Sequence, residues 1–238
     1  MEKSKNAYNG AIKVWKENQE EWWMKENPYL VDNLNKILRR GFWLCSNNPT
    51  GEILLSGVNP SFDGREKAEP CPFRECTGRY WNLWTKIILA EYIAQKKVGY
   101  IDLFPLRVTK QQREFEEFVP LELKAELLRV TQFELERLRP KLIIHANKTS
   151  SFYYGTDPES PWMGYDLEKV EVPGEIGQKG TLYRIKGLMD DKRRINYDEI
   201  RKTNLEYLFV CRMQSRLKSA ERIHREDIKQ LCDHLNIE

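Results

Sequence analysis

The chain of 238 residues suits one large domain or two small ones and is long enough to bury a core of its own. With 40% apolar residues and a net charge of only +3, its composition is that of a soluble globular protein and excludes both a disordered chain and a protein that coats nucleic acid without selection. No apolar run approaches the length of a membrane span and no signal peptide follows Met1, so we expect a cytoplasmic protein without a membrane partner.

The first fifty residues predict helices. Tyr8, Ile12 and Trp15 recur at helical spacing, and a second helix is expected from Leu30 to Leu38. We interpret residues 1–50 as an N-terminal helical extension. Its other aromatic residues fit packing better than base stacking, and they are Trp22, Trp23, Phe42 and Trp43.

From Gly51 on, short apolar runs alternate with helical segments. The runs that predict strands are Glu52–Val58, Gly99–Pro105, Lys141–Ala146, Thr181–Leu188 and Glu206–Arg212. The segments that predict helices are Tyr80–Gln95, Leu121–Leu138 and Ser219–Leu235. This alternation predicts one α/β domain over residues 51–238, a three-layer α/β/α fold around a central, mostly parallel sheet of four to five strands.

Two stretches interrupt the alternation. Phe62 to Thr77 predicts a surface loop between the first strand and its helix. Ser150 to Gly180 is long and rich in glycine, proline and aromatic residues, and within it Lys169–Val172 is a candidate hairpin partner of Thr181–Arg184.

Cysteine usage favours reduced thiols over a disulfide framework, because the five cysteines are odd in number and scattered. Cys71 and Cys76 are separated by four residues, but no second pair stands at ligand spacing. We therefore expect no metal ion.

In an open α/β sheet, ligands bind outside the carboxyl ends of the strands. That rule selects four segments of this chain, which are Gly57–Phe62, Leu103–Arg107, His145–Lys148 and Cys211–Arg216. None of them contains a Gly-x-Gly-x-x-Gly motif or a P-loop, and the chain has no Gly-x-Ser-x-Gly elbow. Dinucleotide and nucleoside-triphosphate binding therefore lack their usual sequence signal.

The first of these segments is the most informative. Gly57 permits a backbone turn that a side chain would obstruct, Asn59 then projects an amide at the sheet edge, and Pro60 fixes the chain direction. Such a turn can aim backbone N–H groups and an amide at one small ligand. The plainer interpretation is a strand-to-helix turn, since Asn-Pro is a common turn dipeptide.

Together, the segments resemble the uracil-DNA glycosylase superfamily. Leu54–Ser61 is similar to the Gly-x-Asn-Pro motif of its mismatch-specific and single-strand-selective branches. The resemblance is supported by Asp102–Arg107 after the second strand, by Arg139–Ile144 leading into the third, and by the serine-containing turn after the last strand. It covers Gly51 to Leu235 in order and spacing.

The resemblance implies a fold of that superfamily and a monomeric, cofactor-free enzyme that flips a damaged or deaminated base out of single- or double-stranded DNA and hydrolyses its N-glycosidic bond. It implies that Asn59 positions the attacking water, which an amide orients without accepting its proton. The positions that it assigns to base binding are Gly57, Val58, Phe62 and Asn147. An aromatic residue of the long loop could stack on the base instead of Phe62, and the plainer interpretation of Phe62 is an aromatic residue that closes its loop against the core.

The turn after the last strand departs from the family pattern. The family places a His-Pro-Ser sequence there, and its histidine stabilises charge on the departing base. This chain has Met213-Gln214-Ser215, so Gln214 or an arginine is the candidate replacement. A catalytically impaired nucleic-acid or nucleotide-binding protein of the same fold is therefore the alternative.

Basic residues gather around this turn. Val210 to Arg225 holds five arginines and lysines against the single acid Glu221. Phosphate binding needs such a patch, whereas the plainer interpretation is a solvated helix face. The residues that we expect to contact phosphate are Pro60, Ser61, Arg212, Ser215 and Arg216.

His145 ends a buried strand and is interpreted as a structural histidine. A third class of function, an unrelated α/β hydrolase or transferase, would instead need a site near His145 with a carboxylate partner and Asn59 pointing away.

Overall fold

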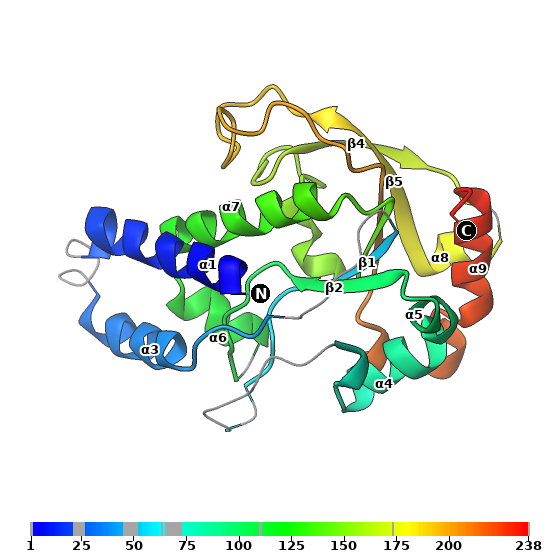
Figure 1. Cartoon of the computed structure of the whole chain (residues 1–238), viewed down its shortest axis with the longest axis horizontal. Helices are drawn as coiled ribbons and strands as arrows, with labels where there is room; N and C mark the ends of the chain where they lie inside the picture. Colours follow the sequence, from blue (N-terminus) through cyan, green and yellow to red (C-terminus); the bar gives the residue numbers. More distant parts are fainter. Residues whose placement is uncertain are drawn as a thin grey trace.

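A six-stranded mixed sheet forms the centre of the described chain, with helices on both of its faces (Figure 1). The computed structural model describes residues 2–20, 27–44, 52–62, 64, 73–109, 111–172 and 174–237. Most of the loop expected between Phe62 and Thr77 lies outside these ranges, as do Trp22 and Trp23.

The strand order is β2-β1-β3-β6-β5-β4. Four strands run parallel, and they are β1 (Ile53–Gly57), β2 (Val98–Asp102), β3 (Leu142–His145) and β6 (Tyr207–Cys211). The α/β class and the parallel core are thus confirmed. The sheet has one strand more than expected, since β4 (Tyr165–Val170) joins the expected β5 (Gly180–Leu188) and the two extend the sheet as an antiparallel hairpin.

That hairpin includes the pairing expected from the sequence. Lys169 is the register partner of Tyr183, and Val170 that of Leu182. The strand begins earlier than expected, at Tyr165, and Val172 lies beyond its end.

The longer helices are α1 (Glu2–Trp15), α3 (Pro28–Arg39), α6 (Gln111–Phe118), α7 (Leu121–Leu138) and α9 (Arg225–His234). The shorter α-helices are α4 (Arg79–Leu83), α5 (Ala90–Ala94) and α8 (Ile176–Lys179). Short π or 3-10 segments are η1 (Lys16–Glu20), η2 (Phe73–Glu75), η3 (Trp84–Ile88), η4 (Lys148–Tyr154), η5 (Gln214–Arg216) and η6 (Ser219–Glu221).

Two expected helices are interrupted. The helix expected over Tyr80–Gln95 is divided into α4, η3 and α5 by the π turn. The helix expected from Ser219 begins only at Arg225, because the carboxylate of Asp227 accepts a hydrogen bond from the backbone N–H of His224 and caps the helix there.

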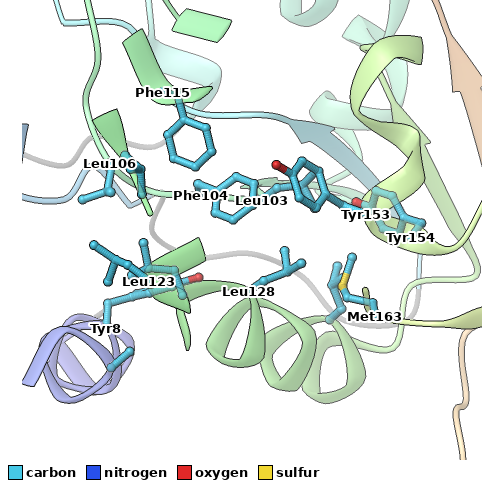
Figure 2. Packing of buried hydrophobic residues seen from close by; sticks show 14 of the residues in the cluster. Tyr8, Leu103, Phe104, Leu106, Phe115, Leu123, Leu128, Tyr153, Tyr154 and Met163 are labelled. Carbon is cyan, nitrogen blue, oxygen red and sulfur yellow. The ribbon is translucent and has the colours of Figure 1, made fainter. Parts of the chain in front are cut away.

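Alternate residues of the parallel strands face two separate apolar layers. Leu54 and Ile143 point to the layer that contains α1 and α7, whereas Leu55 and Ile144 point to the layer that contains η3 and α9. Figure 2 shows part of the first layer, with the ring of Phe104 beside those of Phe115 and Tyr153. The ring centroids of Phe104 and Phe115 are 4.5 Å apart, and those of Phe104 and Tyr153 are 4.9 Å apart.

The first helix lies beside α7 (Figure 1) and belongs to this core. Tyr8, Ala11 and Trp15 are buried in it. The hydroxyl groups of Tyr8 and Thr131 are 2.8 Å apart, and Thr131 donates a 2.7 Å hydrogen bond to the carbonyl of Leu103 at the end of β2. Side chains therefore link the N-terminal helix to the edge of the sheet where ligands are expected.

Candidate functional site

The four segments selected from the sequence follow the carboxyl ends of β1, β2, β3 and β6. Because these strands are parallel, the four ends lie side by side along one border of the sheet, here called the carboxyl edge. Backbone hydrogen bonds join the first two segments, because the N–H of Leu103 donates to Gly57 at 3.0 Å and that of Phe104 donates to Val58 at 2.8 Å. The third segment is joined to β1 by the N–H of Ala146, which donates to Ser56. The segments therefore form one continuous edge.

Gly57 leaves room for a pair of side chains from the neighbouring strand. A Cβ atom at this position would lie 2.3 Å from Oδ1 of Asp102 and 2.3 Å from the hydroxyl of Tyr100. The expected reason for this glycine was a backbone turn that a side chain would obstruct. The structure gives a different reason, the space that the Tyr100–Asp102 pair occupies.

Asp102 is a buried carboxyl group at the end of β2. The hydroxyl of Tyr100 donates a 2.7 Å hydrogen bond to its Oδ1, and the residue is 6% exposed. Burial raises the pKa of Asp102 to about 7, although the hydrogen bond from Tyr100 favours the ionised form. Sequence reasoning missed this group, although an aspartate that ends an apolar strand is itself a signal.

Aromatic rings surround Tyr100 on the same side of the sheet. The ring of Trp81 meets it edge-on with centroids 4.7 Å apart, the ring of Phe73 stacks at 6.1 Å, and that of Trp43 lies at 6.3 Å. Trp43 also donates a backbone hydrogen bond to Pro105, in the segment that follows β2. Trp43 thus has the packing role expected for it.

Asn59 lies at this edge and is 2% exposed. Its amide nitrogen is 3.5 Å from the carbonyl of Pro60, and that carbonyl accepts a hydrogen bond from the N–H of Val108. Val58 is half-buried, whereas Ser61 is exposed. The turn that was expected to carry the chemistry is therefore held against the chain after β2.

Phe62 follows the same turn, but arginines contact its ring. The guanidinium carbons of Arg40 and Arg107 lie 4.5 Å and 5.0 Å from the ring centroid, and Arg40 is itself held by two hydrogen bonds to Glu114. These contacts are cation–π interactions. They give Phe62 the packing role that is one of its two expected roles, and stacking on a base stays a prediction.

Asn147 caps a helical turn. Its Oδ1 accepts hydrogen bonds from the N–H of Thr149 at 3.1 Å and from the hydroxyl of Thr149 at 2.7 Å. The side chain expected to pair with a base edge is thus used as the N-cap of η4.

His145 is confirmed as a structural histidine. It is fully buried, and its Nε2 and Nδ1 lie 2.8 Å and 3.3 Å from the hydroxyls of Ser150 and Ser56. Burial lowers its pKa to about 3, so the ring is neutral at neutral pH. Hydroxyl groups, and not a carboxylate, contact both ring nitrogens, which is not the arrangement that the third class of function needs.

Gln214 is fully buried, and backbone groups use both ends of its amide. Its Nε2 donates to the carbonyl of Arg212 at 2.7 Å, and its Oε1 accepts from the N–H of Ile223 at 2.7 Å. These bonds hold η5 to the segment before α9. Both ends of the amide are thus used in this structure, and contact of Gln214 with a departing base stays a prediction.

The basic patch after β6 is partly exposed. The side chain of Arg212 is 52% exposed and lies 3.9 Å from Glu221, and Arg216 is also exposed, whereas Ser215 is half-buried. Arg222 is used internally, since it donates two hydrogen bonds to the carbonyl of Leu217. Arg212 and Arg216 therefore keep the accessibility that phosphate contact requires.

Within the described ranges, no group of three or more His, Cys, Asp or Glu residues could hold a metal ion, and no helix is long and apolar enough to cross a membrane. Cys71 lies outside the described residues, and Cys76 is a buried free thiol. No protein-family model and no curated protein matches this chain.

Proposed function

We propose that this protein is a DNA N-glycosylase of the uracil-DNA glycosylase kind, which hydrolyses the bond between a damaged or deaminated base and its sugar. The observation that carries the proposal is that the Gly57–Phe62 turn lies beside the other three segments at the carboxyl ends of the four parallel strands. Ligands of open α/β sheets bind at this edge. A fold of that superfamily is part of the proposal.

The reaction requires a positioned water molecule and contacts to the DNA backbone. The amide of Asn59, buried within the turn, is suited to orient the water that attacks the sugar carbon as the glycosidic bond breaks. Arg212 and Arg216 are suited to phosphate contact, because both side chains are exposed next to the end of β6.

A specific observation favours a second candidate, a DNA-binding protein without turnover. Met213 cannot donate a hydrogen bond to a departing base, and the amide of Gln214 is already used by Arg212 and Ile223. At this turn, the remaining side-chain donors for that purpose are the exposed Arg212 and Arg216 and the hydroxyl of Ser215.

The test uses the purified full chain with labelled single- and double-stranded oligonucleotides that carry uracil, hypoxanthine or other base lesions, followed by alkali to cleave abasic sites. We expect strand cleavage at a lesion by the wild type and a rate lower by about 100-fold or more for Asn59→Ala. Salt-sensitive binding without cleavage would instead establish the second candidate. Absence of both binding and cleavage at low salt would overturn both.

A further inference from the structure

Hydrolysis of a glycosidic bond releases a proton from the attacking water, and the Gly57–Phe62 turn offers no group to accept it. An amide such as that of Asn59 orients water but does not take its proton. We therefore expect the proton acceptor among the other acid–base groups at the carboxyl ends of the strands.

Three polar side chains at this edge are unsuitable for different reasons. His145 is enclosed by two serine hydroxyls and stays neutral because of burial. The amide of Gln214 is used by the backbone, and Asn147 caps η4.

Asp102 differs from these three in its chemistry and position. It is the register partner of Gly57, which stands two residues before Asn59, and its Oδ1 lies 2.3 Å from the position that a Cβ of Gly57 would take. Tyr100 engages only Oδ1, and within the described ranges Oδ2 has no hydrogen bond. A carboxylate in this position can accept a proton from a water held at the turn.

We infer that Asp102 is the general base of the proposed glycosylase reaction, held in place by Tyr100 and by the absence of a side chain at Gly57. The inference rests on the proposed function. In the step, the water oxygen forms a bond to the sugar C1′ while the bond from C1′ to the base breaks and its electron pair leaves with the base. The water proton passes to the Asp102 carboxylate, and the departing base takes a proton from solvent.

The charged environment of Asp102 suits this role. Tyr100 on β2 donates a hydrogen bond to Asp102, and the carboxylate charge of Asp102 in turn acts on Tyr154 of η4 and Tyr8 of α1. Tyrosines are neutral at neutral pH, so burial is the main influence on the carboxyl group. Its pKa of about 7 means that both protonation states are populated near neutrality, as a general base requires.

The experiment measures single-turnover excision of the preferred lesion against pH. The wild-type rate should rise with pH and level off above about 7. Asp102→Asn should lower the plateau by about 100-fold and flatten the profile. Tyr100→Phe should keep most of the plateau but move the midpoint to higher pH, because it removes the hydrogen bond that favours the carboxylate.

The matched control is Asp166→Asn, the same change at a half-exposed carboxylate on β4, the opposite edge strand. It should leave the rate and profile unchanged. Wild-type rates and profile in Asp102→Asn would overturn the inference but leave the glycosylase function standing, whereas absence of excision by the wild type would overturn both. If Asp102→Asn fails to fold, an unchanged midpoint in Tyr100→Phe overturns the inference.

Discussion

Gly57 and Asp102 are register partners on β1 and β2, and the carboxyl group of Asp102 occupies the space that a side chain at Gly57 would need. The two residues therefore depend on each other at the carboxyl edge of the sheet. This dependence explains the glycine without reference to any ligand.

Gly57→Ala should destabilise the fold by about 1–3 kcal/mol, because the new methyl group collides with Asp102 and the Tyr100 hydroxyl in a closely packed region. Urea unfolding measures the change. The control is Gly187→Ala on β5, where an added Cβ meets nothing within 4 Å. Equal stabilities of the two variants would contradict the account of Gly57.

The raised pKa of Asp102 makes stability depend on pH. Its pKa is about 7 in the fold against an ordinary value of 3.8, so its contribution is complete below 3.8 and is lost as pH rises to about 7. Relative to Asp102→Asn, the wild type should lose about 1.4 kcal/mol per pH unit across this window. Urea unfolding of both proteins at a series of pH values tests this, and a constant difference would refute it.

The lowered pKa of His145 acts in the opposite direction. The neutral ring contributes fully above its ordinary value of 6.5, and the contribution is lost as pH falls towards about 3. His145→Phe should be less stable by about 1–3 kcal/mol at neutral pH, because two serine hydroxyls lose contacts. It should also lack this acid-dependent component, which unfolding curves at mildly acidic pH would reveal.

Gln214→Leu should behave as a structural variant. Loss of the hydrogen bonds to Arg212 and Ile223 should lower the free energy of unfolding by about 1–3 kcal/mol, while any activity of the folded fraction is kept. Thermal unfolding and excision assays on the same samples separate the two effects. Gln230→Leu, at an exposed position of α9, is the control. A fully stable but inactive Gln214→Leu would restore a catalytic role.

Arg212→Ala and Arg216→Ala should each weaken DNA binding equally for all sequences. Each lost phosphate contact should reduce the slope of log affinity against log salt by about one. Arg201→Ala is the control, since this exposed arginine lies in the connection before β6, away from the carboxyl ends of the parallel strands. Unchanged salt slopes for Arg212→Ala and Arg216→Ala would remove them from the DNA interface.

The parallel core could be predicted because β1, β3 and β6 are short apolar runs between helical segments, a pattern that local sequence carries. The start of α9 could not be predicted. It depends on the hydrogen bond from the N–H of His224 to the carboxylate of Asp227, which fixes the first turn there and not at Ser219. Periodicity does not show which of several polar groups caps a helix.

The strand ends were the predictable part of the candidate site, and the partners of its side chains were not. Phe62 meets arginines from positions 40 and 107, and Gln214 meets the backbone of Ile223. The position of the Tyr100–Asp102 pair opposite Gly57 depends on the register of β1 with β2, which the sequence does not give. Such contacts depend on tertiary packing, which one sequence does not encode in any local pattern.

The link from Tyr8 to Thr131 spans 123 positions of the chain. The ribosome delivers the first helix long before the helix that covers it, so Tyr8 and Trp15 stay exposed to solvent until α7 has emerged. A nascent chain stalled before α7 should therefore be sensitive to protease in its first helix and should bind chaperones there. Helix α1 therefore takes its place in the fold only after α7 has been made.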